Sequence, residues 1–145
     1  KVLYDAGGLY EGVERLLPYS DYLIPSIEFA LKITKTEDVE KAAEILFERY
    51  SPCAVVITMG DKGGLIYDGK KAERYPAFNV KAVDTNGAGD TFFGAALSKL
   101  CKEDLNTLTA DKLEGILAFA NKAASITTSR RGAIPAMPTL TEVEG

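Results

Sequence analysis

Histidine is absent from the 145 residues of this sequence, and so is tryptophan. The missing histidine excludes serine–histidine–aspartate and cysteine–histidine catalysis within the chain, together with any histidine metal site. Proton transfer would therefore have to use a carboxylate, lysine, tyrosine or cysteine side chain.

Long apolar runs are missing too, since none approaches the roughly 18 residues that a membrane-spanning helix needs. The formal net charge of −4 offers no positive surface for nucleic acid. We therefore expect neither a membrane nor a nucleic acid as partner. The composition, 46% hydrophobic and 26% charged, is ordinary for a globular protein. The length suffices for a single domain over residues 1–145.

Cysteine is scarce: the chain has only Cys53 and Cys101, and no motif spacing relates them. Each falls in an apolar segment, which predicts two buried thiols. Unpaired thiols are typical of a reducing compartment, so we expect a cytoplasmic protein.

Strand and helix patterns alternate along the first half of the chain. Short apolar segments at 22–24 and 2–4 predict strands, and the β-branched run at 53–59 predicts a buried parallel strand. Between them, residues 39–50 carry an amphipathic helical stripe that Thr36 would cap. This order favours a right-handed crossover, a mainly parallel sheet and helices on both of its faces. The predicted fold class is therefore α/β, with three α/β/α layers.

Two further segments complete this expectation. Residues 9–17 predict a short helix that Pro18 ends. Residues 64–68 and 72–78 predict a β-hairpin, and Pro76 places its second strand near an edge of the sheet.

The stretch that most strongly suggests chemistry is V-D-T-N-G-A-G-D-T-F-F-G at 83–94. Gly87 and Gly89 flank a small residue, so the backbone can bend sharply and an anion can approach it closely. From Ala88 onward, apolar residues recur every four positions, which predicts that a helix begins here. The free N–H groups and the dipole at a helix N-terminus favour a phosphate, and Asp90 would lie beside it in the first turn.

Two common phosphate-binding motifs do not fit this stretch. A dinucleotide-binding G-x-G-x-x-G would need glycine where Phe92 stands. A Walker loop would need lysine and then serine or threonine after Gly94, where Ala95 and Ala96 follow. From these residues alone, an anion site and a helix start with small residues for close packing both stay open.

The whole string D-T-N-G-A-G-D-T-F resembles the C-terminal signature of the ribokinase-like sugar kinases, the PfkB carbohydrate kinase family. The resemblance implies that the amides of Gly87, Ala88 and Gly89 form an anion hole for the transferred phosphoryl group. It also implies that Asp90 is the catalytic base that takes the proton from a sugar hydroxyl. ATP and Mg²⁺ would be the cofactors.

The resemblance covers residues 52–138 well and residues 1–50 more loosely. It places the nucleotide near the loop at 58–63, which would otherwise be read as a simple turn. Asn121 would contact the adenine, against the alternative of a surface asparagine. The other cofactor-binding residues that it implies are Thr58, Gly60, Lys62, Gly63 and Gly89.

Cation sites follow from the same resemblance. A monovalent cation such as K⁺ would lie in a ring that tunes the anion hole, against the alternative of an ordinary loop network. The family often has Asn-x-x-Glu for magnesium and the phosphates, but here Ser26 replaces the asparagine and Phe29 the glutamate. Glu28 stands one position early, and a helix-capping role is an equal alternative. The residues matching the ring are Asp84, Asn86, Thr127, Arg130 and Gly132.

As a whole, the resemblance implies ATP-dependent phosphorylation of a sugar or sugar-like hydroxyl by a longer parent enzyme. This sequence would be its C-terminal half and supply the nucleotide site, the anion hole and the base. The sugar-binding half would be absent, and the isolated chain inactive. The partners would be ATP or ADP and a small sugar, and the complete enzyme could form a homodimer. Two alternatives stay open: a nucleotide-binding module without catalysis, and a structural domain without a ligand.

Overall fold

The computed structural model describes every residue of the chain, Lys1–Gly145. The chain divides into an N-terminal unit, Lys1–Tyr75, and a C-terminal unit, Pro76–Gly145, which are described in turn. No helix combines the length and the apolar character that crossing a membrane would require. The assignment of residues 1–145 to a single domain stays a prediction.

A five-stranded mixed sheet forms the N-terminal unit, with its strands in sequence order across the sheet. The first three strands are parallel neighbours, and the last two add antiparallel pairings. The predicted α/β class and the hairpin near one edge are thereby confirmed, and the hairpin makes the sheet mixed. The strands are β1 (Leu3–Ala6), β2 (Tyr22–Pro25), β3 (Ala54–Thr58), β4 (Gly64–Tyr67) and β5 (Ala72–Tyr75).

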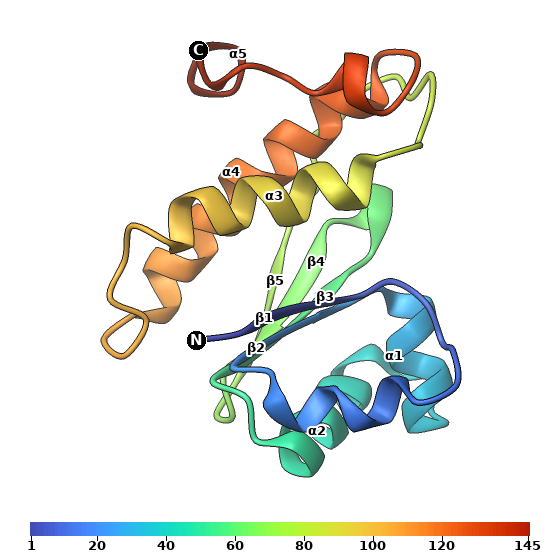
Figure 1. Cartoon of the computed structure of the whole chain (residues 1–145), viewed down its shortest axis with the longest axis vertical. Coiled ribbons are helices and arrows are strands. Elements are labelled where there is room, and N and C mark those ends of the chain that lie inside the picture. The colour runs from blue at the N-terminus through green and yellow to red at the C-terminus, as the bar shows by residue number, and fades with distance from the viewer. The chain divides into compact units, whose positions relative to one another are not determined.

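Helices α1 (Ile27–Thr34) and α2 (Val39–Tyr50) connect β2 to β3. Both lie on the same side of the sheet (Figure 1). Apolar side chains from the strands meet the apolar stripes of the helices there and form the core of this unit. Fully buried members of that core include Leu23, Val55, Ile57, Phe29 and Leu46. The strand–helix–strand order read from the sequence is confirmed.

The expected helix over residues 9–17 is wrong. Two short 3₁₀ turns replace it, η1 (Val13–Arg15) and η2 (Leu17–Tyr19). Gly12 adopts a left-handed conformation with φ 85°, which interrupts a right-handed helix, and Pro18 lies inside the second turn.

The helix cap predicted at Thr36 is also wrong. Asp38 caps α2 instead, because its side chain accepts hydrogen bonds from the backbone N–H groups of Glu40 and Lys41. Thr36 lies two residues earlier, where its hydroxyl accepts a hydrogen bond from the Asp38 N–H at 3.2 Å.

Both cysteines are exposed, so the prediction of two buried thiols is wrong. Cys53 lies in the turn that precedes β3, and the buried strand begins one residue later at Ala54. Cys101 lies at the C-terminal end of the helix Ala88–Leu100, where its thiol donates to the Ser98 carbonyl.

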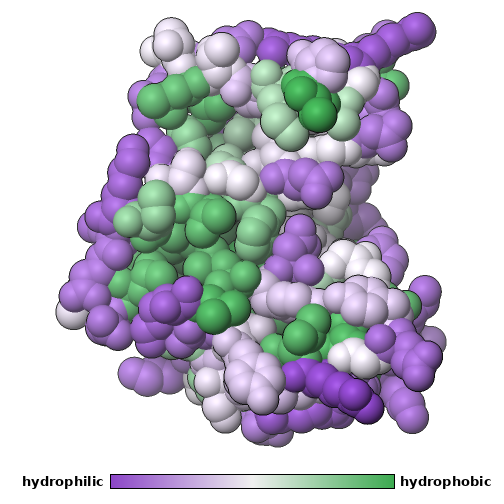
Figure 2. Space-filling model, in the orientation of Figure 1, coloured by the Kyte–Doolittle hydropathy of each residue, from purple (hydrophilic) through white to green (hydrophobic).

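The C-terminal unit is helical, and its two long helices, α3 (Ala88–Leu100) and α4 (Ala110–Thr128), pack against each other (Figure 1). The buried hydroxyls of Thr91 and Thr127 lie 3.2 Å apart and link the two helices. Outside this interface, Leu97 on α3 is 42% exposed. Figure 2 shows apolar areas between the polar parts of the molecular surface. The 3₁₀ turn η4 (Ile134–Ala136) and the short helix α5 (Leu140–Glu144) complete the unit.

Candidate functional site

The signature loop, residues 83–87, leads directly into α3. Gly87 is the N-cap residue of this helix, and Ala88 is its first helical residue, so the predicted helix start is confirmed. The N–H groups of Gly87, Gly89 and Asp90 have no hydrogen-bond partner within the chain. The Ala88 N–H differs, because it donates a long 3.3 Å hydrogen bond to the Thr85 carbonyl. A helix N-terminus with free amides can hold an anion.

Gly87 shapes this loop through its backbone and through a close contact. Its φ is +75°, in the left-handed region that favours glycine. A Cβ at this position would lie 2.8 Å from the Ala133 Cβ and 3.1 Å from the Ala133 Cα. At Gly89 a Cβ would meet no atom within 4 Å. Gly87 is therefore needed for the loop to close on Ala133, whereas Gly89 leaves open space for a ligand.

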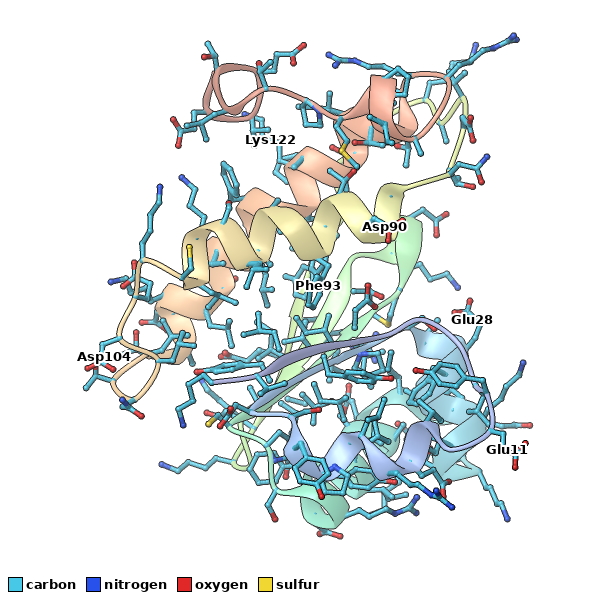
Figure 3. All side chains as sticks on the ribbon, in the orientation of Figure 1. Glu11, Glu28, Asp90, Phe93, Asp104 and Lys122 are labelled. Atoms are coloured by element: carbon cyan, nitrogen blue, oxygen red, sulfur yellow. The ribbon has the colours of Figure 1, made fainter.

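Asp90 lies in the first turn of α3, close to those free amides. Its side chain is exposed and forms no hydrogen bond or ion pair within the chain. Figure 3 shows it at the N-terminal end of α3, one turn before Phe93. A carboxylate here is available to accept a proton from a bound hydroxyl group.

Asp84 joins the signature loop to the loop that follows α4. One carboxylate oxygen accepts a hydrogen bond from the Asn86 N–H at 3.0 Å, and the other from the Gly132 N–H at 2.9 Å. These two donors hold the pKa of the Asp84 carboxyl below its usual value, so the group is ionised at neutral pH. The structure thus brings together Asp84, Asn86 and Gly132, three of the residues predicted to surround a cation.

The backbone N–H groups of Val83 and Asp84 both donate to the Thr128 carbonyl, at 2.7 and 3.1 Å. The signature loop is therefore fixed to the C-terminal end of α4. Thr127 is buried at this end, and its carbonyl accepts a hydrogen bond from the Arg130 N–H at 3.1 Å. Each carbonyl oxygen has two lone pairs, so this bond leaves one for another partner.

The donor set of this region fits a hard monovalent cation in its chemistry, because all the predicted ligands are oxygens. Magnesium has less protein support. Glu28 is exposed in the first turn of α1 and has no partner within the chain (Figure 3). Ser26 caps that helix instead, through a 3.2 Å hydrogen bond from the Phe29 N–H. One carboxylate fits the way Mg²⁺ is often held, by one or two carboxylates together with substrate phosphates.

In the N-terminal unit, the predicted nucleotide loop follows β3 directly. Gly60 and Gly63 have φ values of +59° and +80°, which allow a tight 3₁₀ turn at Gly60–Lys62. Gly63 is buried and donates its N–H to the Gly60 carbonyl at 3.1 Å. The Thr58 hydroxyl donates to the Pro25 carbonyl at 3.4 Å. Lys62 is exposed and forms no ion pair, so its ammonium group is free to meet a phosphate.

Asn121, the residue predicted at the adenine, is buried on α4, and the alternative of a surface asparagine is therefore wrong. Its side-chain nitrogen donates a 2.7 Å hydrogen bond to the Pro76 carbonyl. This contact fixes the start of the C-terminal unit and leaves the amide oxygen for a ligand.

Two residues near the C-terminal end of the chain were given no role from the sequence, Ala133 and Glu142. Ala133 contacts Gly87, and Glu142 forms an ion pair with Arg130 at 2.5 Å. Thr139 and Glu142 have the spacing of a capping box, which the structure confirms at the start of α5. That spacing is the one sequence signal that could have drawn attention to Glu142.

Comparison with known proteins identifies the class of protein to which the chain belongs. A family model described as pfkB family carbohydrate kinase matches residues 2–140. The chain belongs to the PfkB carbohydrate kinase family.

Particular relatives are sugar kinases. The chain is 37% identical over 130 residues to a protein named probable fructokinase-5 from Arabidopsis thaliana, covering 89% of this chain and 40% of the relative. The ribokinase structure from Thermotoga maritima matches with a TM-score of 0.85 and 33% identity, over 99% of this chain and 47% of that protein.

A fructokinase double mutant from Vibrio cholerae, bound to fructose, ADP and a potassium ion, matches with a TM-score of 0.82 and 26% identity. The match covers 91% of this chain and 42% of that one. This chain thus spans less than half the length of each of these three proteins.

Proposed function

We propose that this chain is the nucleotide-binding part of a kinase that transfers the terminal phosphoryl group of ATP to a hydroxyl group of a sugar. The observation that carries the proposal is the start of α3, where free N–H groups lie next to the unpartnered carboxylate of Asp90. Family membership and the named sugar kinases among its relatives support the reaction class.

Each residue would contribute positioning or charge, which is what phosphoryl transfer mainly requires. Asp90 would accept the proton of the attacking hydroxyl group. The free amides of Gly87 and Gly89, with the more weakly engaged amide of Ala88, would hold the transferred group. Lys62 would meet the nucleotide phosphates. Magnesium bound to ATP would neutralise phosphate charge, and Glu28 is the one carboxylate proposed to face it.

A second candidate function is nucleotide binding without turnover. The observation that favours it is that both predicted nucleotide loops contain glycines with positive φ, and that the start of α3 has free N–H groups. ATP binding without sugar phosphorylation by a protein that contains this chain and a complete sugar site would select this function. Absence of any nucleotide binding would select a structural role.

Nucleotide binding is tested by the backbone amide signals of the chain during titration with ADP or ATP and magnesium. We expect shifts at residues 58–63 and, separately, at residues 87–90. Both segments are rich in glycine; the first lies at the end of β3, and the second forms the N-terminus of α3. The amides of α2, such as Leu46, serve as an internal control because they are buried in the core. Shifts confined to other loops would refute the assignment.

Potassium is expected to strengthen nucleotide binding compared with buffer that lacks both sodium and potassium. The physical reason is the ionised Asp84 carboxylate, which lies beside the backbone of Asn86 and Gly132 and would attract a cation. Affinities measured by calorimetry with KCl and with a bulky organic chloride at equal ionic strength give the comparison. Equal affinities would argue against a bound monovalent ion.

A further inference from the structure

We propose that Glu142, on the C-terminal helix α5, is a positioning residue for the anion-binding start of α3. It acts through Arg130, which it holds by an ion pair, and so fixes the loop at 130–133 against the signature loop. The role deepens the nucleotide site proposed above and rests on it.

Glu142 is held from two sides. Its Oε1 accepts a 2.5 Å hydrogen bond from Arg130 Nη2. Its Oε2 accepts from the Thr139 N–H at 2.8 Å and from the Thr139 hydroxyl at 3.1 Å. These donors, the Arg130 guanidinium foremost, lower the pKa of Glu142 to about 2, so its charge persists at any pH used for binding. The carboxylate therefore connects Arg130 to the first turn of α5.

Helix α5 is short, but other contacts fix its place. Val143 is buried against the rest of the C-terminal unit. The Glu144 carboxylate lies 2.8 Å from the Lys99 ammonium group on α3. The same ammonium group lies 4.2 Å from the ring centre of Phe119 on α4. The buried Val143 side chain provides most of this support, because the Glu144–Lys99 pair is surface-exposed and contributes little.

The segment after Arg130 reaches the signature loop within three residues. The Gly132 N–H donates to Asp84, whose other oxygen accepts from the Asn86 N–H. Ala133 packs directly on Gly87. A displacement of Arg130 would therefore move both contacts that shape the loop before α3.

The pair is half-exposed, with Arg130 and Glu142 side chains 39% and 40% accessible. Exposed ion pairs contribute little to global stability. We therefore expect its loss to change the order and ligand affinity of the loop rather than the unfolding of the chain.

The test compares Glu142→Gln with Glu144→Gln in the 145-residue chain. Both variants remove one negative charge from α5, but only the side chain at position 142 contacts Arg130. Glutamine at 142 can still accept the Thr139 N–H, so the capping box is largely kept. We expect Glu142→Gln to shift the amide signals of Gly132 and Asn86 and to weaken ADP binding by about twofold to fivefold. Glu144→Gln should leave these amide signals and the affinity for ADP close to those of the wild type.

Two further measurements separate positioning from general destabilisation. The melting temperatures of both variants should stay close to wild type, and Glu142→Gln should reduce the effect of potassium on ADP affinity. Arg130→Gln should reproduce Glu142→Gln, and the double variant should add nothing, because the two residues act as one pair.

Unchanged Gly132 and Asn86 amides in Glu142→Gln would overturn the proposal, as would equal effects of the two glutamate variants. The amide comparison needs no nucleotide. If the wild-type chain binds no ADP, the nucleotide site is refuted, while the signals of Gly132 and Asn86 still decide whether Glu142 positions the loop.

Discussion

Replacing Asp90 by asparagine is expected to lower the rate of phosphoryl transfer by about 10²- to 10⁴-fold, the usual contribution of a general base. The measurement is sugar-dependent ADP release by a protein that contains this chain and a complete sugar site. The physical reason is that a hydroxyl group is a poor nucleophile until its proton can leave. The chain has no histidine to receive that proton, and Asp90 is the unpartnered carboxylate beside the free amides of α3.

Asparagine keeps the shape of the side chain and leaves the helix amides in place, so nucleotide affinity should change little. Asp111→Asn is the matched control, because Asp111 is also an exposed aspartate in the first turn of a helix, here α4. Asp111 lies outside the signature loop, so the Asp111→Asn variant should transfer phosphoryl groups at the wild-type rate. Near-normal turnover by Asp90→Asn would rule out its role as the base.

The start of α3 could be predicted from the sequence because the information there is local. Two glycines around one small residue, followed by apolar residues every four positions, indicate where a helix begins. The buried strand β3 was predictable for the same reason, from a continuous β-branched run. Local patterns were less reliable at edges: Cys53 lies one residue before the buried strand and is exposed.

The contacts that hold the site could not be predicted because they join segments far apart in the chain. Asp84 meets Gly132, and Asn121 meets Pro76, at separations of 48 and 45 residues. Neither contact has a periodic signature. At residues 9–17 the local pattern was misleading instead. The side chains favoured a helix, but the left-handed backbone of Gly12 interrupts it. Which aspartates carry free carboxylates and which are occupied by backbone N–H groups is therefore a result of the structure.

Replacing Gly87 by alanine is expected to destabilise the chain by about 2–5 kcal/mol and to abolish nucleotide binding at the start of α3. Two costs add. A left-handed backbone, with φ +75° here, costs an L-residue about 1–2 kcal/mol. The new methyl group would also lie 2.8 Å from the Ala133 Cβ, and relieving such overpacking costs about 1–3 kcal/mol. Urea unfolding of the chain measures the sum.

Gly89→Ala and Gly94→Ala are the controls, because both residues lie in α3 and a Cβ at either position meets no atom within 4 Å. Alanine has the higher helix propensity, so neither change should lower stability. Gly94→Ala should also bind nucleotide normally, whereas Gly89→Ala places a methyl group beside the free amides and should weaken binding while the fold is kept. Surface substitutions usually change the free energy of unfolding by no more than about 0.5 kcal/mol. If Gly87→Ala changes it by no more than that, the close packing of Ala133 does not constrain the signature loop.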